Sequence, residues 1–111
     1  MIGRVLQQLG HALVYVHTSP ITVATTGVTV IAAPGAGLRI VVLGGQGCVS
    51  KKATVRWLAG ATPITGTMAA IEGAVLRVPI VVMPEDTALI CDVVGSGATY
   101  DGWLMHGAVR A

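Results

Sequence analysis

The stretch TTGVTVIAAPGAGLRIVVLGG, residues 25–45, most constrains what this chain can fold into. Apolar and small polar residues alternate up to Pro34-Gly35, and the alternation resumes beyond that pair. Alternation with a period of two predicts a β-strand, and a Pro-Gly pair predicts a turn. We therefore expect a hairpin. Arg39 is its one charged residue, so something must cover both of its faces.

The chain from residue 20 onward has the same character. Turn signals separate short strand-like segments every 8–12 residues, and no segment has the apolar spacing of a crossover helix. The segments are residues 21–33, 37–45, 53–60, 61–71, 73–83, 85–94 and 103–111. We predict an all-β fold for residues 20–111, namely an antiparallel β-sandwich that is jelly-roll-like.

Residues 1–19 have a different pattern. Val5, Leu9 and Ala12 lie near helical spacing, whereas Leu13, Tyr15 and His17 alternate. A short helix, an extended arm and a strand therefore all remain open. We predict an N-terminal arm, residues 1–19, that clasps a neighbouring molecule.

The composition indicates a protein that works by contact. Hydrophobic residues make up 53% of the 111 residues and charged residues 11%, where an ordinary soluble domain has about 25% charged. A free monomer this poor in charge exposes apolar surface, and large exposed patches mark partner sites. We expect a homo-oligomer or an assembly subunit.

Nucleic acid and membrane are not expected partners. The net charge is +2, and the seven basic residues are scattered rather than gathered in a stripe. Residues 5–38 carry no charge, but Pro20, Pro34 and five threonines interrupt every candidate membrane span. Gln7, Gln8 and His11 interrupt the apolar run that a signal peptide needs, so we expect none.

The residues that usually carry chemistry form no recognisable constellation. The three histidines, His11, His17 and His106, are dispersed, and no Ser or Cys sits in a nucleophile motif. The Glu85-Asp86 pair after Pro84 predicts a turn. We expect no enzyme activity, no metal and no cofactor.

The tryptophans and cysteines allow two interpretations each. Trp57 and Trp103 supply core bulk in a chain without Phe, or they form a carbohydrate platform. Exposure of one indole beside polar groups would favour the platform, and burial of both would exclude it. Cys48 and Cys91 are predicted to be reduced core residues, with a bridge between neighbouring strands as the alternative.

A set of strand and turn motifs spans residues 25–110. The motifs lie at residues 33–42, 54–57, 62–66, 85–89 and 102–107. In this arrangement the chain resembles small bacteriophage virion structural proteins of the jelly-roll-like capsid decoration, or cement, type. The resemblance implies a subunit on the capsid surface of a virion, made in the bacterial cytoplasm. It also implies a major capsid protein as partner and a homotrimer as the favoured oligomer. Another virion component, such as a tail, baseplate or head-fibre subunit, is the alternative, and a carbohydrate-binding module is a third.

Two groups of residues are predicted to contact a partner. The first group lies in the arm, and the second lies in the polar segment QGCVSKK, where the lysines would meet an acidic surface. These residues are Arg4, Leu6, Leu9 and Tyr15 in the first group, and Lys51 and Lys52 in the second.

Overall fold

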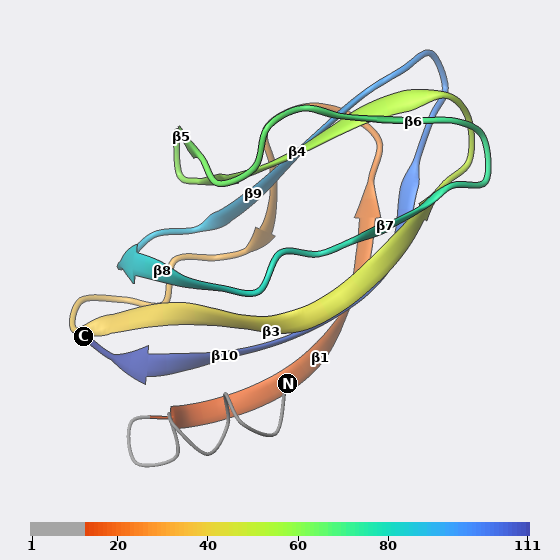
Figure 1. The fold of residues 1–111 in the computed structure, drawn as a ribbon. Helices are drawn as coiled ribbons and strands as arrows, with labels where there is room; N and C mark the ends of the chain where they lie inside the picture. Colours follow the sequence, from red (N-terminus) through yellow and green to blue (C-terminus); the bar gives the residue numbers. More distant parts are fainter. Residues whose placement is uncertain (1–12) are drawn as a thin grey trace.

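The computed structural model describes residues 13–111, and these form ten β-strands and no helix (Figure 1). The strands are short except for three of 11 or 12 residues. Their bounds are β1 (Leu13–Val23), β2 (Val28–Ile31), β3 (Leu38–Val49), β4 (Ala53–Ala59), β5 (Thr62–Pro63), β6 (Met68–Ala70), β7 (Val75–Arg77), β8 (Val81–Glu85), β9 (Leu89–Val94) and β10 (Tyr100–Arg110).

The strands make two five-stranded antiparallel sheets that pack face to face. Sheet A has the order β1-β10-β3-β7, and β8 also pairs with β3. Sheet B has the order β2-β9-β4-β5, and β6 also pairs with β4. In Figure 1 the long strands β1, β10 and β3 form the lower layer, and β4 and β9 lie above them. The predicted all-β sandwich is confirmed.

The opening stretch is a crossover between the sheets, so the predicted hairpin is wrong. Strand β2 pairs with β9 in sheet B, whereas β3 pairs with β10, β7 and β8 in sheet A. The backbone N–H groups of Gly35 and Gly37 donate to the side chains of Asp86 and Glu85, each at 2.9 Å. The Glu85-Asp86 pair, where the sequence predicted a turn, therefore holds the crossover in place through these hydrogen bonds. One face of β2 and one face of β3 are covered by the opposite sheet.

Strand β1 begins earlier than the predicted sandwich. Its residues pair with β10 in register from Leu13↔Val109 to Val23↔Tyr100. The expected boundary between residues 19 and 20 therefore falls inside this strand, and residues 13–19 belong to the sandwich. Pro20 is tolerated because, among the described strands, β1 pairs only with β10 and forms an edge. The rest of the predicted arm, residues 1–12, lies outside the described residues.

An aromatic pair joins the two sheets at the centre of the core. Trp57 of β4 and Tyr100 of β10 are both fully buried, with ring centroids 6.1 Å apart in an edge-to-face arrangement. The Tyr100 hydroxyl donates to the Leu76 carbonyl oxygen at 2.7 Å. Gly47 on β3 leaves room for the ring, because a Cβ there would lie 2.6 Å from two of the ring atoms. Gly102 is directly opposite Gly47 on β10. Aliphatic side chains fill the space around this pair.

The two cysteines are free and lie in different environments. Cys91 is buried among the core residues, and burial, followed by the nearby Asp92 charge, raises the pKa of its thiol to about 12. Cys48 is exposed on the outer face of sheet A, where its Sγ lies 3.4 Å from the Gly73 carbonyl oxygen. Both cysteines are free, as predicted. The predicted position in the core is confirmed for Cys91 and wrong for Cys48.

A methyl group at Gly102 has no space in this fold. A Cβ there would clash with the Gln46 carbonyl oxygen and lie 2.5 Å from the Gly47 Cα, and both are backbone atoms that cannot rotate away. We expect Gly102→Ala to lower the free energy of unfolding by about 1–3 kcal/mol, the usual cost of overpacking. Urea denaturation measures this change. Gly66→Ala is the control, because nothing lies within 4 Å of a Cβ at Gly66, and we expect it to unfold like the wild type. Equal stability of the two variants would contradict the close approach of β3 and β10 at Gly102.

Candidate contact surface

The predicted contact residues lie in separate places. Tyr15 is half-buried on β1, in the same register row as Ala108 and Ile40. Lys51 and Lys52 are exposed in the loop between β3 and β4, beyond Val49 at the other end of β3. Val49 lies nine positions after Ile40, which is about 30 Å along a strand. Arg4, Leu6 and Leu9 lie outside the described residues, so the structure brings together only the two lysines.

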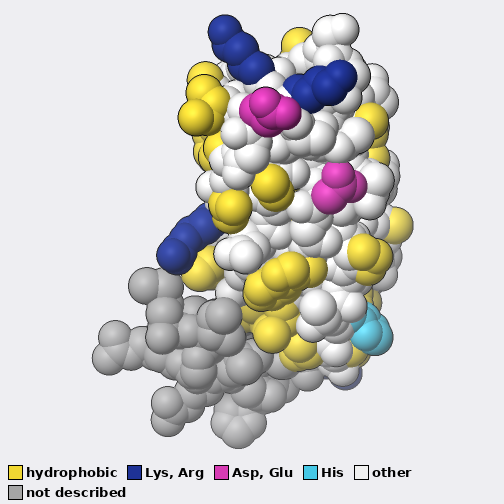
Figure 2. All heavy atoms as spheres, turned by 90° about the vertical axis from the view of Figure 1, so that its right-hand side faces the viewer, with side chains coloured by type: hydrophobic (Ala, Val, Ile, Leu, Met, Phe, Trp, Pro, Cys, Tyr) yellow, Lys and Arg dark blue, Asp and Glu magenta, His cyan; other side chains and the backbone are white. Residues whose placement is uncertain are grey.

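Three loops meet at the lysine end of the sandwich. They are the β3–β4 loop, the β6–β7 loop and the β9–β10 loop, which lie on the right of Figure 1. Ser50 donates its backbone N–H to the Thr99 carbonyl oxygen, and the Thr99 N–H donates to the Ser50 Oγ, both at 2.9 Å. This pair of hydrogen bonds holds the lysine loop against the β9–β10 loop. Figure 2 faces this side of the molecule and shows basic and acidic side chains close together at its upper end, with scattered hydrophobic side chains over the rest of the face.

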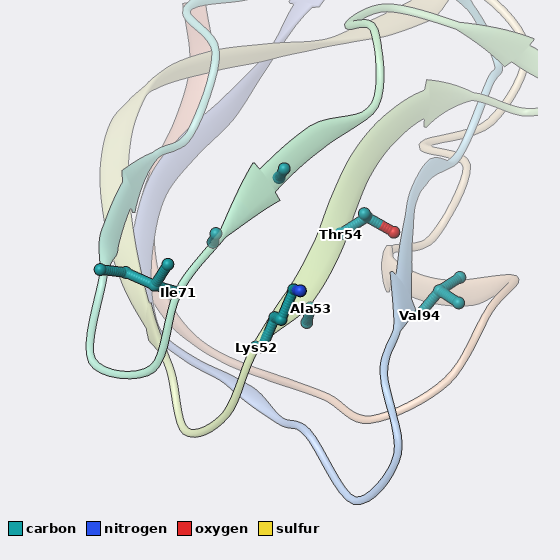
Figure 3. Close-up of a pocket in the computed structure, with 7 residues that line it drawn as sticks. Lys52, Ala53, Thr54, Ile71 and Val94 are labelled. Atoms are coloured by element: carbon teal, nitrogen blue, oxygen red, sulfur yellow. The ribbon is translucent and has the colours of Figure 1, made fainter.

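An apolar hollow of about 330 Å³ opens on the outer face of sheet B at this end (Figure 3). Thr54 of β4 lies between Ala69 of β6 and Val94 of β9 in one register row. Their side chains point away from the core because the neighbouring residues on β4, Ala53 and Val55, are buried in it. The remaining lining residues are Lys52, Ala53, Ala70 and Ile71.

The hollow arises from a difference in side-chain size. Thr54 and Ala69 are small, whereas Val94 and Ile71 project on either side of them with 57% and 75% of their surface exposed. Figure 3 shows Val94 and Ile71 on opposite sides of Thr54 and Lys52. The surface is therefore a shallow apolar depression with two projecting aliphatic side chains.

The rim of the hollow carries charge of both signs: Lys52 lines it, and Glu72 follows the lining residue Ile71 in the β6–β7 loop. Within residues 14–111 the one ion pair joins Arg56 to Asp92, at 2.9 Å, and it lies one register row beyond the hollow. The Gly27 N–H, at 2.7 Å, and the Arg56 guanidinium hold the pKa of Asp92 below its ordinary value. Lys51 and Lys52 have no such carboxylate partner in the described chain. The predicted attraction of this loop to an acidic surface stays a prediction.

A second polar cluster surrounds Tyr15, on the inner face of sheet A near the free edge. His17 and His106 are directly opposite each other on β1 and β10, with ring centroids 5.9 Å apart. The Tyr15 ring lies 4.9 Å from that of His17 and 6.5 Å from that of His106. His106 is buried, and its Nε2 is hydrogen-bonded to the Ser19 Oγ at 2.9 Å. Tyr15 therefore packs within the molecule rather than standing free on it.

The two tryptophans have different environments. Trp57 is fully buried, as its role in core packing predicts. Trp103 is 43% exposed on the outer face of sheet A, because its neighbour Leu104 points to the inner face and is buried. Burial of both indoles would have excluded a carbohydrate platform. Because Trp103 is exposed, the platform is not excluded.

The described residues contain no candidate metal site. Within residues 14–111 no three His, Cys, Asp or Glu side chains are grouped so that they could hold a metal ion. No helix in the described chain has the length and apolar content needed to cross a membrane. No protein-family model matches the chain, and no curated protein matches it.

Sequence reasoning found the lysines of this surface but missed its apolar part. Thr54, Ala69 and Val94 are far apart in the chain, and each belongs to a segment that alternates like many others. The available signal was the apolar character of both faces of residues 85–94, which indicated an outward-facing Val94. Only strand pairing shows that the three residues share a row.

The environment of His106 predicts how stability depends on pH. Burial and the neighbouring His17 hold the pKa of His106 below its ordinary value of 6.5. As the pH falls below about 6.5, His106 becomes protonated in the unfolded chain before it does so in the folded chain. We expect the free energy of unfolding to fall as the pH decreases from 7 to 5, measured by urea denaturation.

A matched variant tests this assignment. In His106→Gln the loss of stability between pH 7 and pH 5 should be smaller than in the wild type, whatever the stability at pH 7. The imidazole signal of His106 in an NMR titration gives an independent measurement. A His106 midpoint at or above about 6.5 would contradict the burial of this side chain.

Proposed function

We propose that this chain is a bacteriophage capsid decoration (cement) protein, which binds the outer capsid surface and stabilises contacts between major capsid subunits. The observation that carries the proposal is apolar exposure on a charge-poor sandwich. Large hydrophobic side chains project from both sheets and their loops with 41% to 75% of their surface exposed. They are Val14, Val16, Ile71, Val75, Ile80, Val82, Val94 and Trp103.

Such a surface suits a protein held in place by partners. Isolated exposed aliphatic residues are ordinary, but here eight large hydrophobic side chains are exposed on a domain with only 11% charged residues. A cement protein needs a stable scaffold, faces for partners and no reaction centre. A closed core with an aromatic pair between its sheets supplies such a scaffold. The strand and turn motifs of residues 25–110 support the same proposal.

The hollow on sheet B is the proposed contact with the major capsid protein. Val94 and Ile71 offer apolar area, and Lys51 and Lys52 offer exposed positive charge that forms no ion pair within residues 14–111. The complementary partner surface is a projecting apolar side chain flanked by carboxylates. Many weak contacts of this kind on a symmetric lattice add up through avidity. A homo-oligomer, with a trimer favoured, would bring several hollows to one capsid site.

Copy number in purified particles tests the proposed function. We expect hundreds of copies per particle, measured by mass spectrometry against the major capsid protein, because a cement protein occupies lattice sites over the whole shell. About a dozen copies or fewer would assign the protein to the tail, neck or a vertex. Complete absence would overturn the virion role.

Charge reversal tests the contact surface. We expect Lys52→Glu to weaken binding to capsids prepared without the protein by about three- to tenfold at low salt, and by less at high salt, because rim charges are screened. Sedimentation of capsids with bound protein measures the affinity. Arg110→Glu makes the same charge change in the last residue of β10, and we expect it to bind like the wild type. Equal binding by both variants at low salt would remove this surface from the proposal.

A further inference from the structure

Trp103 stands near the middle of the outer face of sheet A. It is directly opposite Pro20 on β1 and Gln46 on β3, and Gln46 is in turn opposite Arg77 on β7. Neighbouring strands lie about 4.8 Å apart, so Pro20 and Gln46 flank the indole at about that spacing. Trp103 is 43% exposed, and the other three residues are also exposed.

Hydrogen-bonding side chains lie on both sides of this row. The neighbouring outward-facing row carries Thr22 on β1 opposite Asp101 on β10, and both are exposed. The Thr99 hydroxyl donates to the Asp101 carboxylate at 2.8 Å and so orients it. On the other side of Trp103, Thr18 is exposed on β1. The indole and Pro20 thus form a small apolar strip, with an amide, two hydroxyls and charges of both signs around it.

We propose that the Trp103 face of sheet A binds the pyranose rings of a carbohydrate chain. One face of a β-linked glucose or N-acetylglucosamine ring presents only C–H groups, which can lie on an indole, and its hydroxyls point outward around the rim. A pyranose ring is about as wide as the spacing between strands, about 4.8 Å. A ring stacked on Trp103 therefore places its hydroxyls over Gln46, Asp101 and Thr22, where they find both donors and acceptors.

The chemistry of the face favours a neutral sugar over a protein partner. A protein interface has a contiguous apolar centre with a polar rim. Here the row of Trp103 is apolar only at the indole and Pro20. The neighbouring rows mix polar side chains with apolar ones, Asp101 and Thr22 with Cys48 and Val75 on one side, and Thr18 with Met105 on the other. Arg77 and Asp101 carry opposite charges on either side of the strip, so the face as a whole repels neither a cationic nor an anionic ligand. A flat uncharged ring with hydroxyls around it satisfies this arrangement.

Tryptophan fluorescence tests the proposal directly, because the chain has only two tryptophans and Trp57 is fully buried. The full chain is titrated with cellohexaose and with chitohexaose. We expect at least one of them to shift the emission of Trp103 to shorter wavelength and to protect it from acrylamide quenching. Trp103→Ala should weaken the binding of that sugar roughly 30-fold, the size of a hot-spot truncation, in isothermal titration calorimetry.

Val82→Ala is the matched control, because Val82 is 48% exposed on β8 of the same sheet and lies outside the Trp103 rows. It should bind the sugar like the wild type. Binding of neither hexasaccharide would overturn the proposal. Binding that Trp103→Ala leaves unchanged would also overturn it, because the sugar would then lie elsewhere. The proposal does not rest on the virion role, so absence of the protein from particles would leave it standing.

Discussion

The contact between Trp57 and Tyr100 is the interaction on which the rest of the structure depends. The two rings come from opposite sheets and meet edge to face at the centre of the core. In a chain without Phe, no other fully buried pair supplies comparable aromatic area within the described residues. Tyr100 lies over Gly47, and its hydroxyl fastens β7 through Leu76. The ring therefore sets the distance between the sheets and the position of three strands in sheet A.

This packing also places the loops that form the proposed capsid contact. Tyr100 begins β10 directly opposite Val49, so the residues just before Tyr100 lie beside those just after Val49. Ser50 and Thr99 exchange hydrogen bonds there, and the lysine loop lies next to the hollow on sheet B. The Trp103 face belongs to the other sheet. The two proposed surfaces therefore point in different directions, and one molecule could use both at once.

Features of the fold that depend on residues close together in the sequence could be predicted, whereas features that depend on distant residues could not. Residues 53–60 were predicted as a strand, and β4 spans Ala53–Ala59, because alternation is a local property of the chain. Residues 25–45 were predicted to contain two strands, and they do, but their pairing was wrong. A Pro-Gly turn joins strands of one sheet or of two sheets with the same local sequence, and the choice was made by distant partners, β9 and β10. The candidate contact surface was likewise predictable only where it depends on local sequence. Its lysines were visible as polar residues in a loop, whereas its apolar residues come from three strands that are far apart in the sequence.

The sequence by itself determined that the chain is all-β, that it is poor in charge and that its strands are apolar on more than one face. These properties depend on the period and the composition of short segments, and both can be taken from the sequence without knowing how the strands pair. Only the tertiary structure decided which face of each strand met the core. It placed Trp57 inside and Trp103 outside, and Cys91 inside and Cys48 outside. The physical reason is that a shift of one residue in register turns every side chain of a strand to the other face. Packing across the whole sandwich therefore determines which apolar residues remain available to a partner.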